Sequence, residues 1–248
     1  MRRAIRSLVS LVCYVVFLGT FLYLIAFTDD LDLAFVPTTV SRGPAAPLGL
    51  ALAIDIALIA LFGLQHSLMA RPKFKAQWTR IVPPSLERSV YVLMSSLALI
   101  LLFAFWRPVG GTIWSVSGLI GATLFVAGFL GWAVVLISTF LLNHFELFGL
   151  AQAWRNPAAP ATAPVMRIPF FYKWVRHPIY VGFLIALWLS PEMTASRMLL
   201  ALGMTIYVLI GVAHEERDLI TTFGDDYIRY KAKVGMLLPR LTGRAGTP

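Results

Sequence analysis

Long apolar runs constrain this sequence more than any other feature. Crossing a bilayer takes roughly 20 mostly apolar residues in an α-helix, and four runs approach or exceed that length, while two shorter ones follow. We expect membrane helices at residues 8–27, 48–69, 89–106, 113–142, 178–190 and 197–212. Of the 248 residues, 58% are hydrophobic and only 13% are charged, which excludes an ordinary soluble domain.

Backbone polar groups in hydrocarbon must pair within their own segment or within a closed barrel, and no alternating strand pattern is present. The sequence therefore predicts an all-α, polytopic integral membrane protein with about six membrane helices. A helix over residues 178–191 would rise only about 20 Å, less than a hydrocarbon core of roughly 30 Å. The last two runs thus predict a short C-terminal helical hairpin, and the polar segment after it predicts a cytoplasmic amphipathic helix.

Basic residues gather before the first run and in alternate connections. They are Arg2, Arg3 and Arg6, then Arg71, Lys73, Lys75, Arg80 and Arg88, and then Arg155, Arg167, Lys173 and Arg176. By the positive-inside rule, both termini are predicted to be cytoplasmic, in a bacterial inner membrane, with an even number of spans. The net charge of +9 is explained by these short loops beside anionic lipid, so no nucleic-acid partner is expected.

Metal and disulfide chemistry have little support. Cys13 is the single cysteine and lies within the first run, so an intrachain disulfide is excluded. The four histidines, His66, His144, His177 and His214, fall in separate segments without the spacing of a metal site, and no metal is expected.

Arg176 and His177 stand directly before Pro178 and the fifth apolar run. Proline suits the first turn of a helix, where its missing N–H would have no partner. The start of a helix also favours an anion, and two neighbouring cations add to that field. The alternative is an ordinary interfacial belt, because Tyr172, Lys173 and Trp174 come just before.

The segment after the last run is the second polar block. It begins with His214, Glu215, Glu216, Arg217 and Asp218. Since a hairpin brings its two ends together, we expect Glu215 and Glu216 to approach Arg176 and His177. Such a cluster suits a zwitterionic ligand, although an exposed ion-pair network that only fixes the hairpin is the alternative.

The motifs "VRHPIYVGF" and "EERDLITTFGDDYIRYKAKV" resemble the C-terminal half of the isoprenylcysteine carboxyl methyltransferase and phospholipid methyltransferase superfamily of integral membrane enzymes. Three other segments, "LFGLQHSLMARPKFKAQW", "RSVYVLMSSLALILLFAFWRP" and "LLNHFELFGLAQAW", resemble the bacterial methanethiol S-methyltransferase family. They are also similar to a family of accessory membrane proteins linked to denitrification.

The resemblance implies a single methyltransferase domain that uses S-adenosyl-L-methionine. Residues 1–142 would form the scaffold and acceptor side, and residues 143–248 the donor-binding half. It implies donor-binding roles for Arg176, His177, Pro178, Tyr180, Gly182, Glu215, Glu216, Tyr227 and Tyr230. The donor's carboxylate would face Arg176 and His177, and its ammonium Glu215 or Glu216.

The implied reaction is S-methylation of a small thiol, which turns methanethiol into dimethyl sulfide. A thiol must lose its proton before it attacks, so a base is expected. His66 and His144 are the candidate bases, Glu216 is a further catalytic candidate, and Gln65 and Asn143 are candidates for substrate contact. The alternatives are a prenylcysteine carboxylate or phospholipid amine as acceptor, or an accessory or transport protein without turnover.

Overall fold

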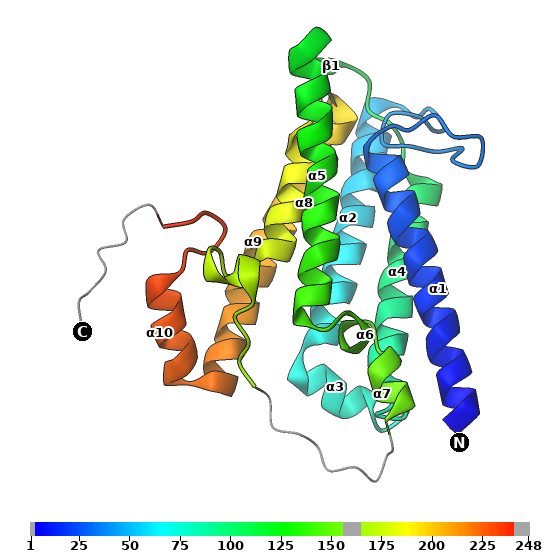
Figure 1. Cartoon of the computed structure of the whole chain (residues 1–248). Coiled ribbons are helices and arrows are strands. Elements are labelled where there is room, and N and C mark those ends of the chain that lie inside the picture. Colours follow the sequence, from blue (N-terminus) through cyan, green and yellow to red (C-terminus); the bar gives the residue numbers. More distant parts are fainter. Residues whose placement is uncertain (1–2, 156–164, 241–248) are drawn as a thin grey trace.

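The computed structural model describes residues 3–155 and 165–240. Within these ranges, five helices are long and apolar enough to cross a membrane: α1 (Arg3–Thr28), α2 (Leu48–Ala70), α4 (Glu87–Phe105), α5 (Gly118–Leu142) and α9 (Ala195–Phe223). A shorter apolar helix, α8 (Pro178–Trp188), lies among them. Together they form one elongated bundle (Figure 1). The prediction of an all-α, polytopic membrane protein is confirmed.

The short elements lie at the two ends of the bundle (Figure 1). At the lower end are α3 (Pro72–Trp78), α6 (His144–Leu147), α7 (Leu150–Trp154), the 3-10 helix η1 (Phe170–Lys173) and α10 (Asp225–Lys233). At the upper end, β1 (Thr112–Ser115) pairs antiparallel with β2 (Glu192–Thr194), Ser115 opposite Glu192. This pairing joins the α4–α5 connection to the turn between α8 and α9.

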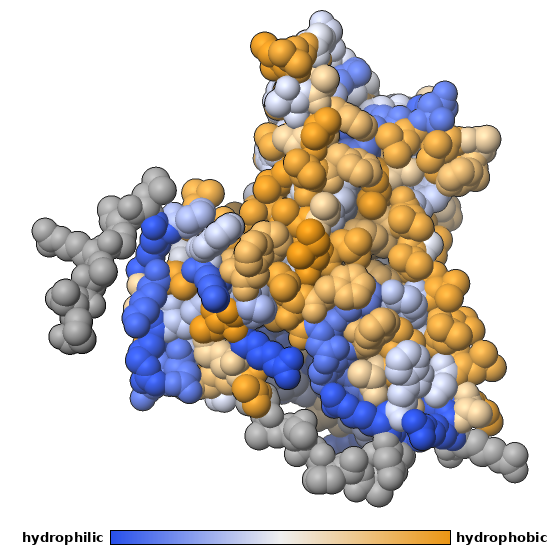
Figure 2. Space-filling view, in the orientation of Figure 1, coloured by the Kyte–Doolittle hydropathy of each residue, from blue (hydrophilic) through white to orange (hydrophobic). Residues whose placement is uncertain are grey.

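The outer surface of the bundle is apolar, as expected of helices that face lipid. Leu8, Leu64 and Leu119 are among the exposed large side chains of α1, α2 and α5. Figure 2 shows hydrophobic residues over the middle and upper bundle, with hydrophilic residues gathered around the lower end and over α10. The lower end is therefore the polar end, and it holds the residues that the sequence singled out.

Two predicted boundaries were wrong. The fourth apolar run does not begin its helix at Ile113, because residues 112–115 form β1 and α5 starts only at Gly118. The last helix does not end at Val212 but continues through the charged block to Phe223, 29 residues in all. Glutamate, arginine and leucine are good helix formers, and the chain has no breaker there before Gly224. The second arm of the hairpin is therefore long.

Small residues allow α8 to pack very closely against α5. A Cβ added at Gly182 would lie 2.7 Å from the carbonyl oxygen of Gly131 and 2.8 Å from the backbone nitrogen of Val135. Gly182 and Ala186 stand one turn apart on this face, a spacing common where membrane helices approach each other. The contact fixes the position of α8, and with it the His177–Pro178 step at its start.

Candidate active site

The backbone around Arg176 is held by the C-terminal segment. The N–H of Arg176 donates to the Gly235 carbonyl at 2.8 Å, and the N–H of His177 donates to that of Met236 at 3.3 Å. Pro178 then begins α8, as predicted, and no side chain caps this end of the helix. The two motifs recognised in the sequence thus meet at one point, where α8 starts and α10 ends.

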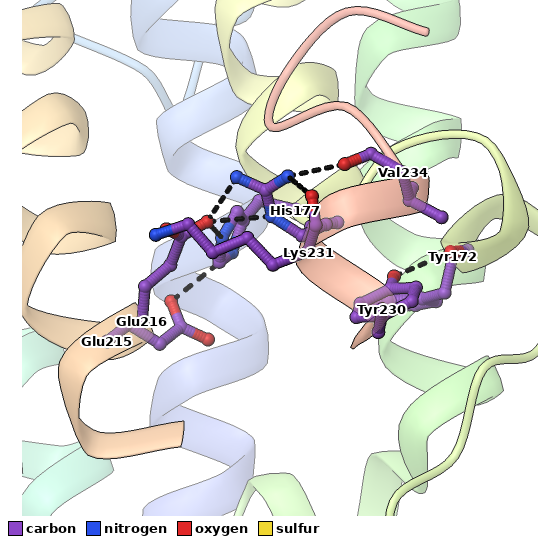
Figure 3. Close-up of polar contacts among 8 residues, drawn as sticks. Tyr172, His177, Glu215, Glu216, Tyr230, Lys231 and Val234 are labelled. Atoms are coloured by element: carbon purple, nitrogen blue, oxygen red, sulfur yellow. Dashed lines mark hydrogen bonds and ion pairs between the residues drawn. The ribbon is translucent and has the colours of Figure 1, made fainter. Parts of the chain in front are cut away.

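Glu216 lies at the centre of this meeting point (Figure 3). Its carboxylate accepts from Arg176 Nη2 at 2.6 Å, from Lys231 Nζ at 2.6 Å and contacts His177 Nε2 at 3.3 Å. The side chain is only 8% exposed. Removing a carboxylate from water is costly unless it is paired and hydrogen-bonded, and here several cationic groups surround it.

The guanidinium of Arg176 is also largely occupied by hydrogen bonds within the protein. Its Nε donates to Glu216 Oε1 at 2.8 Å, while its Nη1 donates to the carbonyls of Lys231 and Val234. The guanidinium therefore ties the start of α8 to α9 and to the end of α10. It contributes to the frame of the site, and few of its donors remain for a ligand.

His177 and Glu215 make a second, looser pair. His177 is buried, and its Nδ1 lies 3.6 Å from Glu215 Oε2, so its ring stands between the two glutamates. Glu215 is 45% exposed. The expected convergence of opposite charges is confirmed, but the two glutamates differ, because Glu216 is enclosed by partners and Glu215 is accessible.

Helix α10 adds two buried tyrosines. Tyr230 donates its hydroxyl to the Tyr172 carbonyl at 2.6 Å, and burial raises the pKa of Tyr230 to about 12, against the opposing effect of Arg176. Burial and the charge of Glu216 raise the pKa of Tyr227 above its usual range. The Tyr227 hydroxyl is buried without a hydrogen-bond partner among the described residues. It is therefore a protonated donor that no described group satisfies.

One face of α9 leads from this cluster toward α2. Tyr207, Gly211 and Glu215 are spaced four residues apart, so they lie on the same face over about 12 Å. Tyr180 reaches this face from α8, since a Cβ added at Gly211 would lie 3.9 Å from its hydroxyl. The Tyr207 ring packs near-perpendicular to that of His66, with centroids 6.0 Å apart.

The two candidate bases therefore differ in position. His66 faces α9 through Tyr207. His144 instead faces α1, where its Nε2 lies 2.8 Å from the Tyr14 hydroxyl, and its ring stacks on Phe140 with centroids 4.1 Å apart. Of the two histidines, His66 is the one that packs against the α9 face on which Glu215 lies.

The remaining candidates have structural contacts of their own. Gln65 donates to Met69 Sδ at 3.0 Å, and its carbonyl oxygen is buried without a described partner. Asn143, in the left-handed region with φ 115°, caps α6 and donates to Glu146 Oε2 at 2.9 Å. Asn143 also lines a polar cavity of about 280 Å³ beside Arg88. Gly182 lies at the α5–α8 contact and away from open space.

Sequence reasoning missed Lys231 and Tyr207. Lys231 follows Tyr230 in a segment with several charges, and nothing in its sequence position indicates that it reaches Glu216. Tyr207 lies inside an apolar run and is typical of core packing. Its spacing of eight residues from Glu215 was the only available signal, and that signal needs a continuous α9.

The chain is similar over nearly its full length to several curated enzymes. It is 46% identical to methanethiol S-methyltransferase of Mycobacterium tuberculosis over 243 residues, which cover 96% of this chain and 98% of the relative. It is 48% identical to the methanethiol S-methyltransferase of a Pseudomonas strain, over 94% of this chain and 89% of that one. The chain belongs to the methanethiol S-methyltransferase family.

A more distant similarity extends beyond that family. Nurim of Danio rerio is 32% identical over 178 residues, which cover 68% of this chain and 64% of nurim. No family model matches the chain, and no solved structure matches it. The resemblance inferred from the motifs is thus confirmed at the level of the methanethiol S-methyltransferase family.

Proposed function

We propose that this protein transfers a methyl group from S-adenosyl-L-methionine to methanethiol and releases dimethyl sulfide. The observation that carries the proposal is the 46% identity to a methanethiol S-methyltransferase across nearly all of both chains. The cluster at the start of α8 supports it independently, because it combines a helix start, a buried cation–carboxylate network and an accessible carboxylate.

The residues present fit such a donor. S-adenosyl-L-methionine has a carboxylate, an ammonium, a sulfonium and an adenosine. The start of α8, with His177, would hold the carboxylate, and Glu215 would hold the ammonium. The unpartnered Tyr227 hydroxyl and the Tyr180 ring would contact the remaining groups, and rings attract a cation such as a sulfonium.

Five of the residues predicted to bind the donor are proposed to have a positioning role instead. They are Arg176, Pro178, Gly182, Glu216 and Tyr230. Their contacts hold the start of α8 against α5, α9 and α10. We propose that they keep the donor-binding groups in place without contacting the donor extensively. Lys231 belongs with them, since it completes the set of cationic groups around Glu216.

Methyl transfer from a sulfonium to a thiol is a displacement in which the positive charge on sulfur disappears. Alignment of the two sulfur atoms and exclusion of water are therefore the main tasks of the protein. We place the acceptor between Glu215 and His66, on the α9 face that includes Tyr207. We keep the predicted division as part of the proposal: residues 1–142 would supply the acceptor side, with α9 facing it, and residues 143–248 would supply the donor side.

For the membrane arrangement, we propose an inner bacterial membrane with the polar end and both termini in the cytoplasm. The chain alternates direction through α1, α2, α4, α5, α8 and α9, an even number of passes, so α1 begins at the end where α9 finishes (Figure 1). The donor site then opens to the compartment where the donor is made.

The test is detection of dimethyl sulfide in the headspace above membranes that contain the protein, S-adenosyl-L-methionine and methanethiol. His177→Ala and Glu216→Ala are expected to abolish product, and binding of S-adenosylhomocysteine to purified protein should weaken in both. Asp32→Ala is the matched control, because it breaks an exposed ion pair with Arg42 at the other end of the bundle. Donor binding without product from the parent would contradict the proposed acceptor and direct attention to prenylcysteine and phospholipid acceptors.

A further inference from the structure

His66 is held by two hydroxyl groups of α4. Its Nε2 lies 2.7 Å from the Tyr91 hydroxyl, and its Nδ1 lies 3.0 Å from Ser95 Oγ. Ser95 Oγ donates its own proton to the Tyr91 carbonyl at 3.0 Å, so it accepts from His66 Nδ1–H. This assigns the proton of the neutral imidazole to Nδ1, and Nε2 is left to accept from the Tyr91 hydroxyl.

Tyr91 belongs to the same interior region as the donor site. Tyr91 is 6% exposed, and its ring centroid lies 5.0 Å from that of His66. The His66 ring also packs against Tyr207 of α9, with centroids 6.0 Å apart, and Tyr207 shares its helix face with Glu215. The Tyr91 oxygen, with its proton directed at His66, keeps its lone pairs as acceptors for another proton donor.

On the basis of the proposed function, we propose that Tyr91 and His66 form a proton relay that deprotonates the thiol acceptor. Tyr91 is the group that contacts the thiol, His66 receives the proton through it, and Ser95 positions His66. The family resemblance gave His66 only as one of two candidate bases, and it gave no role to Tyr91 or Ser95.

The step balances in protons and electrons. The thiol S–H bond breaks as its proton passes to the Tyr91 oxygen, and the Tyr91 proton passes to His66 Nε2. The electron pair left on sulfur forms the new bond to the methyl carbon, while the old carbon–sulfur pair returns to the donor's sulfur. A neutral thioether leaves, and the imidazolium of His66 later releases the proton to solvent.

A relay of this kind would remove the proton that the thiol must lose before it attacks. An ordinary alkyl thiol is largely un-ionised at neutral pH, and the thiolate is the nucleophile. A neutral imidazole that accepts through a hydroxyl can take a proton there, and the surrounding rings of Phe62, Tyr91 and Tyr207 disfavour its charged form, so that the proton is given up again between turnovers. The Arg88 guanidinium carbon lies 5.1 Å from the centre of the Tyr91 ring, so its charge favours a negative charge on the thiol sulfur or on the Tyr91 oxygen during the transfer.

The chain contains a matched control for the relay. His144 is also bracketed by a tyrosine and a hydroxyl: Tyr14 lies 2.8 Å from its Nε2, and Thr139 Oγ1 lies 2.8 Å from its Nδ1. This second set faces α1 and does not share the α9 face. Tyr14→Phe therefore removes an equivalent hydroxyl from the bundle without touching the relay.

The experiment compares methanethiol with trifluoroethanethiol, a small thiol that its fluorine atoms make far more acidic. Tyr91→Phe is expected to lower methanethiol methylation by about 100-fold or more, a typical contribution of general base catalysis. The loss should be much smaller with trifluoroethanethiol, which supplies thiolate without a base. The rate of Tyr91→Phe with methanethiol should also rise with pH in proportion to the thiolate fraction. Tyr14→Phe should resemble the parent with both thiols.

Two further readouts separate the relay from a structural role. S-adenosylhomocysteine binding should be unchanged in Tyr91→Phe. Nitrogen NMR of the histidine rings should show His66 protonated at Nδ1 in the parent and a mixture of the two tautomers in Ser95→Ala. The rate of methanethiol methylation by Ser95→Ala should also decrease more than its rate with trifluoroethanethiol, by a smaller factor than in Tyr91→Phe. If Tyr91→Phe does not bind S-adenosylhomocysteine, the relay is tested by Ser95→Ala instead: a loss selective for methanethiol supports it, and equal losses with both thiols contradict it.

The possible outcomes are distinct. Equal losses with both thiols, or a Tyr91→Phe rate within a few-fold of the parent, would overturn the relay and leave the proposed function standing. A methanethiol-selective loss in Tyr14→Phe would move the base to His144. A parent that binds S-adenosylhomocysteine but methylates neither thiol would overturn the proposed function, and the relay with it.

Discussion

Arg197 and Asp29 form an ion pair between residues that are far apart in the sequence. Arg197 Nη2 lies 3.1 Å from Asp29 Oδ1, and the two side chains are 4% and 8% exposed. Arg197 also donates to the Ala186 carbonyl at 2.9 Å, and Trp132 Nε1 donates to Asp29 Oδ2 at 2.9 Å. One pair therefore joins α1, α5, α8 and α9 at the end of the bundle away from the candidate site.

We expect Arg197→Met to destabilise the protein strongly. The substitution leaves the Asp29 carboxylate and several backbone carbonyls buried without their donor. Breaking a buried pair from one side typically costs about 3–5 kcal/mol. The Tm of the purified protein in detergent should fall markedly, and binding of S-adenosylhomocysteine should decrease only as the folded fraction decreases.

The control is Asp32→Asn, which breaks the Arg42–Asp32 pair. That pair is short, at 2.5 Å, but its side chains are 42% and 92% exposed. Exposed pairs contribute at most about 1 kcal/mol, so the Tm should change little. Equal Tm decreases in the two variants would show that burial does not determine the contribution of these pairs.

The two adjacent glutamates should respond differently to loss of charge. Glu216→Gln leaves Arg176 and Lys231 facing each other around a neutral group, so both the Tm and binding of S-adenosylhomocysteine should decrease. Glu215→Gln removes an accessible carboxylate that lies 3.6 Å from His177 Nδ1. Its Tm should stay near that of the parent while binding weakens.

Calorimetric titration with S-adenosylhomocysteine and a thermal scan of each variant test this difference. S-adenosylhomocysteine keeps the amino-acid end of the donor and lacks only the transferred methyl group, so it reports on the groups that Glu215 would hold. A Glu215→Gln protein that binds as tightly as the parent would contradict the role proposed for Glu215. A Glu216→Gln protein with an unchanged Tm would contradict the structural role of Glu216.

The sequence alone was sufficient to predict the helical bundle and the approach of the Arg176–His177 motif to the Glu215–Glu216 motif. Apolar length predicted the membrane helices, and hairpin geometry predicted that Glu215 and Glu216 approach Arg176 and His177. These features depend on local composition and on chain connectivity, both of which can be read directly from one sequence.

The different environments of similar residues within the site could not be predicted in the same way. Glu215 and Glu216 are neighbours of the same type, and the contacts of Glu216 with Arg176 and with Lys231 of α10 make it enclosed while Glu215 stays accessible. His66 and His144 likewise look equivalent in sequence, at the ends of two apolar runs. Which of them faces α9 depends on how α2 and α5 are rotated in the bundle, and weak amphipathic patterns do not fix that rotation.

Gly182 should tolerate no side chain. Gly182→Ala places a Cβ against the backbone of Gly131 and Val135 on α5, and backbone cannot move aside as a flexible side chain can. Overpacking of this kind typically costs about 1–3 kcal/mol. The Tm should fall, and donor binding should fall with it because α8 carries His177.

Gly211→Ala is the matched substitution on α9. The nearest group to its Cβ would be the Tyr180 hydroxyl at 3.9 Å, an ordinary contact. Alanine is favoured over glycine within a helix by about 1 kcal/mol, so the Tm should hold or rise. If Gly182→Ala were equally stable, the close approach of α5 and α8 would be wrong.

His144 should make the protein sensitive to mild acid. Burial lowers the pKa of His144, so the folded state favours the neutral ring, while the unfolded chain takes up a proton near pH 6.5. The unfolded state therefore binds more protons as the pH falls below about 6.5, and the free energy of unfolding decreases in that direction. The Tm should be lower at pH 5 than at pH 7.

His144→Gln tests the source of that sensitivity, because glutamine does not titrate and still offers a donor and an acceptor to Thr139 and Tyr14. The variant should be less stable than the parent at pH 7, since it loses the stacking on Phe140. Its Tm should also change less between pH 7 and pH 5. An undiminished acid sensitivity would assign the effect to other groups, and a larger one would mean that the folded state binds the proton more tightly than the unfolded chain does.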